Sequence, residues 1–134
     1  MAKPAIPAAQ GTEEYDLKTI LIVEDDADVR EALSDLLQSR GYRVSSADDG
    51  AKALRWLRES DAPGLILLDL MMPVMDGHEF IAQRNADPVL AGIPVVVISA
   101  GRHPRGSVVP GAAEILYKPF EPDHLMRIVE RFCG

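Results

Sequence analysis

Six polar residues stand directly after short apolar runs, and their types suit the binding of a cation together with a phosphate group. They are Glu24, Asp25, Asp26, Asp69, Ser99 and Lys118. Carboxylates that share a small pocket repel one another unless a cation lies among them, and hard oxygen ligands suit Mg2+. A cation, a hydroxyl and an ammonium group around a free carboxylate can hold a transferring phosphoryl group. Phosphorylation of an Asp is therefore chemically reasonable here.

The acidic residues also have a purely structural interpretation. Glu24, Asp25 and Asp26 can simply open a helix, because acids in a first turn interact favourably with the helix dipole. For this triplet alone the two interpretations are about equally good. Asp69 is harder to explain in that way, because it follows four apolar residues and a carboxylate at a buried strand end is costly without a partner.

Short apolar runs alternate with helical patterns from Thr19 onward. The runs predict five strands, at Ile20–Val23, Tyr42–Ser46, Leu65–Leu68, Pro94–Ile98 and Glu114–Tyr117. Helices are predicted by apolar residues at helical spacing: between Val29 and Leu37, after Asp49-Gly50, after Asp76-Gly77, and between Leu125 and Phe132. Gly41 is expected to end the first helix.

This alternation predicts an α/β fold, a doubly wound parallel sheet with helices on both faces. Five strands in this length suit the flavodoxin-like order 2-1-3-4-5. Ligands in such folds bind beyond the carboxyl ends of the strands. The polar residues that follow strands one, three, four and five are therefore expected to converge on one pocket.

Length and composition restrict the function further. The chain has 134 residues and a net charge of −7, which suits one soluble domain and leaves no room for a separate output module. We expect a flexible tail over residues 1–17 and a single domain over residues 18–134. The acidity argues against direct nucleic-acid binding, and no apolar run is long enough to span a bilayer. The single cysteine, Cys133, fits a reducing cytoplasm.

Four sequence motifs together resemble the receiver domain of two-component response regulators. They are Ile22-Val23-Glu24-Asp25-Asp26, Asp69-Leu70-Met71-Met72-Pro73-Val74-Met75-Asp76-Gly77, Ser99-Ala100 and Lys118-Pro119-Phe120. The resemblance runs from about Thr19 to the C-terminus. It implies a single-domain, chemotaxis-type receiver that accepts phosphate on Asp69 from the phosphohistidine of a histidine kinase or phosphotransfer protein.

The resemblance also implies a role for each remaining site residue. Mg2+ would be bound directly by Asp25, Asp69 and the backbone carbonyl of Met71, and through water by Glu24. Ser99 and Lys118 would contact phosphoryl oxygens, beside Ala100, and the peptide bond before Pro119 would be cis. Output would pass by protein–protein contact to a downstream protein, with only self-phosphorylation and autodephosphorylation as activities.

Three features depart from the family pattern. Ser99 stands where Thr is usual, and Ile115 stands where the family has an aromatic switch residue, so the usual coupling to a rotating ring is in doubt. Residues 101–111 contain three Gly and two Pro, which disfavour a helix. We therefore expect the fourth helix to be short or absent.

Two alternatives remain open at this point. The chain can be a receiver fragment of a hybrid kinase or multi-domain regulator. Less readily, it can be an Asp-nucleophile phosphohydrolase, but such enzymes carry a second acid two residues after the nucleophile, where this chain has Met71.

Trp56 lies off the apolar face of its predicted helix, so it is expected to be partly exposed and can anchor an interface.

Overall fold

The structure is a computed structural model that describes residues 19–70, 77–99, 109 and 111–133. Several expectations fall outside these residues: the tail over residues 1–17, the carbonyl of Met71, Ala100, and most of the segment predicted to lack a regular helix. Gly111, which is described, has a φ of 93°. A right-handed helix cannot continue through that conformation, so any helix before it ends by this residue.

Five parallel strands form one sheet in the order β2-β1-β3-β4-β5, as predicted. The strands are β1 (Thr19–Val23), β2 (Arg43–Ala47), β3 (Leu65–Asp69), β4 (Val95–Ser99) and β5 (Glu114–Tyr117). Each bound lies within one residue of the sequence-based prediction. β3 and β4 are buried along their whole length, since they lie inside the sheet and carry apolar side chains on both faces.

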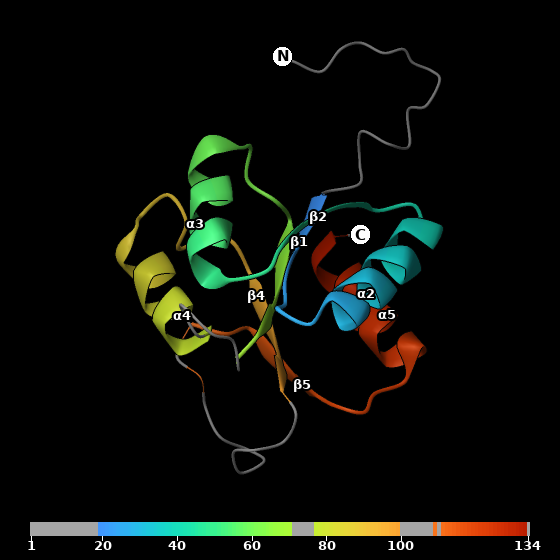
Figure 1. Cartoon of the computed structure of the whole chain (residues 1–134). Helices are drawn as coiled ribbons and strands as arrows, with labels where there is room; N and C mark the ends of the chain where they lie inside the picture. Colours follow the sequence, from blue (N-terminus) through green and yellow to red (C-terminus); the bar gives the residue numbers. More distant parts are fainter. Residues whose placement is uncertain (1–18, 71–76, 100–108, 110, 134) are drawn as a thin grey trace, which may run out of the picture.

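Helices cover both faces of the sheet (Figure 1). They are α2 (Ala27–Ser39), α3 (Gly50–Glu59), α4 (Gly77–Ala86) and α5 (Pro122–Cys133). α2 and α5 lie on one face, while α3 and α4 lie on the other. Asp26 caps α2 by accepting hydrogen bonds from the amides of Asp28 and Val29, and Asp49 caps α3 by accepting one from Lys52.

Alternate strand residues divide the core into two clusters. Leu21, Ile66 and Val97 pack with α3 and α4, whereas Ile22 and Leu67 pack with α2 and α5. Burial of both sheet faces stabilises the strands and fixes their carboxyl ends side by side. Within the described residues, no helix is long and apolar enough to cross a membrane.

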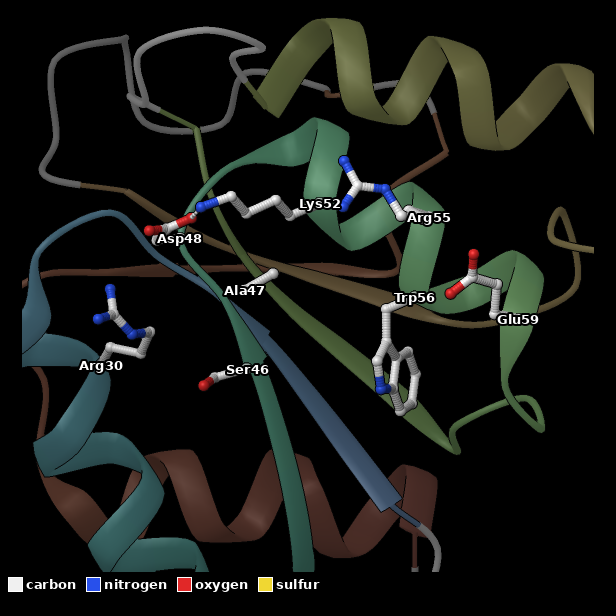
Figure 2. Close-up of a pocket in the computed structure, with 8 residues that line it drawn as sticks. All are labelled: Arg30, Ser46, Ala47, Asp48, Lys52, Arg55, Trp56 and Glu59. Carbon is white, nitrogen blue, oxygen red and sulfur yellow. Dashed lines mark ion pairs between the residues drawn. The ribbon is translucent and has the colours of Figure 1, made fainter.

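A groove of about 460 Å³ runs across the outer edge of the sheet, beside β2 (Figure 2). Residues from α2, β2 and α3 line it: Arg30, Ser46, Ala47, Asp48, Lys52, Arg55, Trp56 and Glu59. Trp56 is half-buried against the core cluster of α3 and α4, which agrees with the predicted partial exposure. The groove adjoins the strand ends where the candidate site lies, because Ala47 ends β2 and Arg30 also donates to the backbone carbonyl of Glu24.

Candidate functional site

The carboxyl ends of β1 and β3 bring three acidic side chains together. Carboxylate oxygens of Glu24, Asp25 and Asp69 all lie within 4.8 Å of one another. Glu24 and Asp69 are buried, with exposed fractions of 2% and 8%, while Asp25 is exposed to solvent. Three anions at this spacing repel one another strongly, so the cluster needs a proton or a cation to be stable.

The third acid of the triplet has a different task. Asp26 uses its side chain to cap α2, with oxygen-to-nitrogen distances of 2.9 Å to Asp28 and 3.3 Å to Val29. Its own backbone amide donates a hydrogen bond to Oε2 of Glu24 at 3.2 Å. The structural interpretation therefore holds for Asp26, which caps the helix, while Glu24 and Asp25 lie in the acidic cluster.

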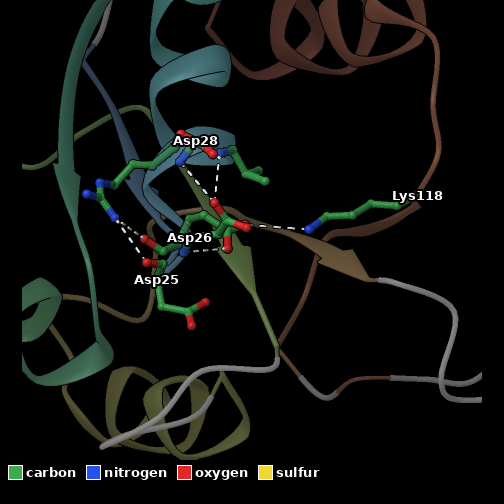
Figure 3. Close-up of polar contacts among 7 residues, drawn as sticks. Asp25, Asp26, Asp28 and Lys118 are labelled. Atoms are coloured by element: carbon green, nitrogen blue, oxygen red, sulfur yellow. Dashed lines mark hydrogen bonds and ion pairs between the residues drawn. The ribbon is translucent and has the colours of Figure 1, made fainter.

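Lys118 approaches the cluster from the end of β5. Its Nζ lies 3.6 Å from Oε1 of Glu24, and in Figure 3 its side chain points toward the turn that holds Asp25 and Asp26. The backbone amide of Lys118 donates to the carbonyl of Ser99 at 2.7 Å. The Lys118–Pro119 peptide bond is cis. β4 and β5 thus hold the hydroxyl and the ammonium group at the same edge of the sheet as the acids.

Burial has a strong effect on Glu24. The pKa of its carboxyl group is raised from 4.5 to about 7. Loss of solvent is the main cause and the adjacent Asp69 contributes to the rise, while the amide of Asp26 and the charge of Lys118 oppose it. Oε1 of Glu24 is buried and has no hydrogen-bond partner among the described residues. An oxygen in an acidic cluster that has an ion pair at 3.6 Å but no hydrogen bond within the described residues fits a site for a cation.

The donor set agrees with Mg2+, since this ion prefers oxygen ligands and one or two carboxylates. Of the residues predicted for the site, the structure therefore brings together Glu24, Asp25, Asp69 and Lys118, with Ser99 at the neighbouring strand end. Ile115 lies on β5, half-buried against the core cluster of α3 and α4. Met71 and Ala100 fall outside the described residues.

Sequence reasoning missed two arginines with structural roles, and only the first of them lies at the site. Nη1 of Arg30, on α2, donates to the backbone carbonyls of Glu24 at 2.9 Å and Asp25 at 3.4 Å. Arg84, on α4, is buried and donates to the carbonyls of Gly111, at 3.1 Å, and Ile93. No sequence signal identified them, because an arginine on an amphipathic helix is normally exposed.

Comparison with known proteins shows the family to which the chain is related. Residues 20–130 match the family model of the response regulator receiver domain. The chain is 36% identical over 110 residues to the DNA-binding response regulator MtrA of Mycobacterium tuberculosis, covering 80% of this chain and 46% of MtrA. It is 32% identical over 117 residues to an uncharacterized 14.6 kDa protein of Leptolyngbya boryana, covering 85% and 88% of the two chains.

A solved structure also matches. The receiver domain of the sensor histidine kinase PA1611 from Pseudomonas aeruginosa, which has a magnesium ion coordinated in its active site cleft, aligns with a TM-score of 0.77 and 30% identity. The alignment covers 86% of this chain and 96% of that domain. The chain spans about half the length of MtrA. The chain belongs to the response regulator receiver domain family.

Proposed function

We propose that the chain accepts a phosphoryl group on Asp69 from the phosphohistidine of a partner histidine kinase or phosphotransfer protein. The observation that carries this proposal is the buried carboxylate of Asp69 at a strand end, within 4.8 Å of two further carboxylates. A carboxylate oxygen of Asp69 attacks phosphorus, an O–P bond forms, and the P–N bond to the imidazole breaks. The leaving imidazole takes up a proton from solvent.

The chain's own residues supply most of what this transfer requires. Glu24 and Asp25 provide carboxylates, and the Mg2+ that they and Asp69 would bind offsets the charge that accumulates on the phosphoryl oxygens. The backbone carbonyl of Met71 is proposed as a further ligand, and Glu24 as one that acts through water. Lys118 would pair with one phosphoryl oxygen and Ser99 would donate a hydrogen bond to another, because both stand at the neighbouring strand ends.

Output is proposed to proceed by contact with another protein, in the cytoplasm. Ile115 is packed against the core cluster of α3 and α4 and carries no ring that can rotate outward. We therefore propose that the signal is read without an aromatic switch at this position. Whether the chain acts alone or as the receiver part of a longer regulator or hybrid kinase is decided by the intact mass of the native protein.

The phospho-acceptor assignment is tested by incubating the protein with acetyl phosphate and Mg2+ and measuring its intact mass. The parent protein should gain the mass of one phosphoryl group, and the Asp69→Asn variant should gain none. Asp61→Asn, which changes an exposed acid elsewhere, is the matched control and should label like the parent. Equal labelling of the parent and Asp69→Asn would show that the acceptor is a different residue.

A further inference from the structure

Glu24 and Asp25 lie in a turn between two regular elements, the β1–α2 turn. β1 ends at Val23 and α2 begins at Ala27, so neither acid belongs to a strand or a helix. A backbone hydrogen bond joins the turn to the sheet, from the amide of Glu24 to the carbonyl of Ala47 at 3.0 Å. Among the described residues, no backbone amide donates to the carbonyls of Glu24 and Asp25. The place of these two acids therefore depends on a side chain that satisfies the carbonyls.

Arg30 is that side chain. It is the fourth residue of α2, and helical side chains run back toward the N-terminus of their helix, which here is the end at the turn. Its Nη1 lies 2.9 Å from the carbonyl oxygen of Glu24 and 3.4 Å from that of Asp25. A hydrogen bond from a charged donor is stronger than a neutral one, and half-burial of Arg30 limits competition from water. Arg30 thus holds the turn from the helix side.

A carboxylate at the end of β2 attracts the same guanidinium. The pKa of Asp48 lies below its usual value, mainly because Lys52 hydrogen-bonds to it, and the charge of Arg30 contributes to the lowering. Asp48 directly follows Ala47, whose carbonyl accepts the amide of Glu24. Arg30 therefore links α2, the β1–α2 turn and the end of β2.

We propose that Arg30 is a positioning residue for the metal cluster, which holds the β1–α2 turn so that the carboxylates of Glu24 and Asp25 stay beside Asp69. The three carboxylates lie within 4.8 Å of one another, a spacing that a small shift of the turn would widen. The inference rests on the proposed binding of Mg2+ by these acids and adds the group that orients them. Groups that orient metal ligands from outside typically change metal affinity by about 10- to 100-fold.

The charge of Arg30 acts in the opposite direction. A positive charge beside the cluster repels Mg2+, so removing the guanidinium should tighten binding if charge alone matters. Removing the two hydrogen bonds to the turn should weaken binding if Arg30 positions the acids. The sign of the change in Mg2+ affinity therefore separates the two effects.

The experiment measures Mg2+ affinity by calorimetric titration at pH 8. Arg30→Met keeps an apolar stem and removes the charge and the donors, and it should raise the dissociation constant at least about 10-fold. Arg55→Met is the matched control, because Arg55 lines the same groove but projects from α3, on the other side of β2 (Figure 2), and forms no ion pair within the described part of the chain. The control should bind Mg2+ at least as tightly as the parent. Equal or tighter binding by Arg30→Met would overturn the proposal.

Labelling by acetyl phosphate gives a second readout. Arg30→Met should need about 10-fold more Mg2+ for half-maximal labelling and should reach the rate of the parent at saturating Mg2+. A lower saturating rate with an unchanged Mg2+ requirement would show a general structural defect and refute positioning. Arg30→Lys should recover part of the affinity, because a single nitrogen of Arg30 makes both bonds and an ammonium group can replace it. No recovery would contradict the proposal.

Two controls keep the outcomes distinct. Urea unfolding in EDTA shows that each variant is folded, and if Arg30→Met is not, Arg30→Gln takes its place with the same expectation, since its shorter side chain cannot reach the turn. If the parent protein binds no Mg2+, the proposed metal site is wrong and the role of Arg30 falls with it. If the parent binds Mg2+ and labels on Asp69 while Arg30→Met matches it, only the role of Arg30 is overturned.

Discussion

Glu24→Gln is expected to stabilise the metal-free protein at alkaline pH. Because the pKa of Glu24 is about 7 in the folded chain and 4.5 in the unfolded chain, the folded chain holds a proton that the unfolded chain releases between these values. Stability is therefore lost as the pH rises from 4.5 to 7, and the full cost remains above 7. At about 1.4 kcal/mol for each pH unit, this cost is at most about 3 kcal/mol.

Glutamine has nearly the same size as glutamate and carries no charge, so it should avoid this cost. In EDTA, urea unfolding at pH 8 should show Glu24→Gln more stable than the parent by up to about 3 kcal/mol, and at pH 5 by about 1 kcal/mol. Added Mg2+ should reverse the order at pH 8, because the cation stabilises the carboxylate that the variant lacks.

The exposed Glu31 on α2 provides a matched control. Glu31→Gln removes the same charge from the same part of the chain, and it should change the free energy of unfolding by no more than about 0.5 kcal/mol at both pH values. If Glu24→Gln differed from the parent by the same amount at pH 5 and at pH 8, burial would not be what raises the pKa of Glu24.

Three further substitutions test the fold and the supports of the site. Gly77→Ala should destabilise by about 1–3 kcal/mol in urea unfolding, because its Cβ would lie 2.6 Å from Cα of Leu70, while Gly92→Ala, with open space around it, should be nearly neutral. Arg84→Met should cost about 2–4 kcal/mol by the same measurement, since the buried carbonyl of Ile93 and the part-buried carbonyl of Gly111 lose their donor. Asp26→Ala should cost about 1 kcal/mol in thermal unfolding through loss of the helix cap.

The sheet was predictable because its central strands are apolar on both faces. Four or five successive apolar residues leave little choice of strand position in β1, β3 and β4. β4 and β2 were both predicted one residue too early, and β2 is also more polar, with Arg43, Ser45 and Ser46. Its position depends on pairing with β1, where Thr19 lies opposite Arg43, and the sequence of β2 alone does not contain that information.

The acidic site was predictable for a topological reason, because carboxyl ends of parallel strands meet at one edge whatever the details of packing. The separate roles of Glu24, Asp25 and Asp26 were not predictable in this way. Only the orientation of α2 shows that Asp26 turns its carboxylate toward the helix amides and Glu24 turns inward. The burial of Arg84 was not predictable for a similar reason, since it depends on carbonyls supplied by distant segments.

The charge of the site links its stability to its proposed chemistry. Glu24, Asp25 and Asp69 contribute three negative charges when ionised, and Lys118 offsets one of them. The remaining two equal the charge of one divalent cation, and without a cation the site lowers its charge by keeping a proton on Glu24, as the pKa of about 7 indicates. A proton on Glu24 and a cation in the cluster would therefore oppose each other's binding, so the affinity for Mg2+ is expected to rise with pH until Glu24 is fully ionised.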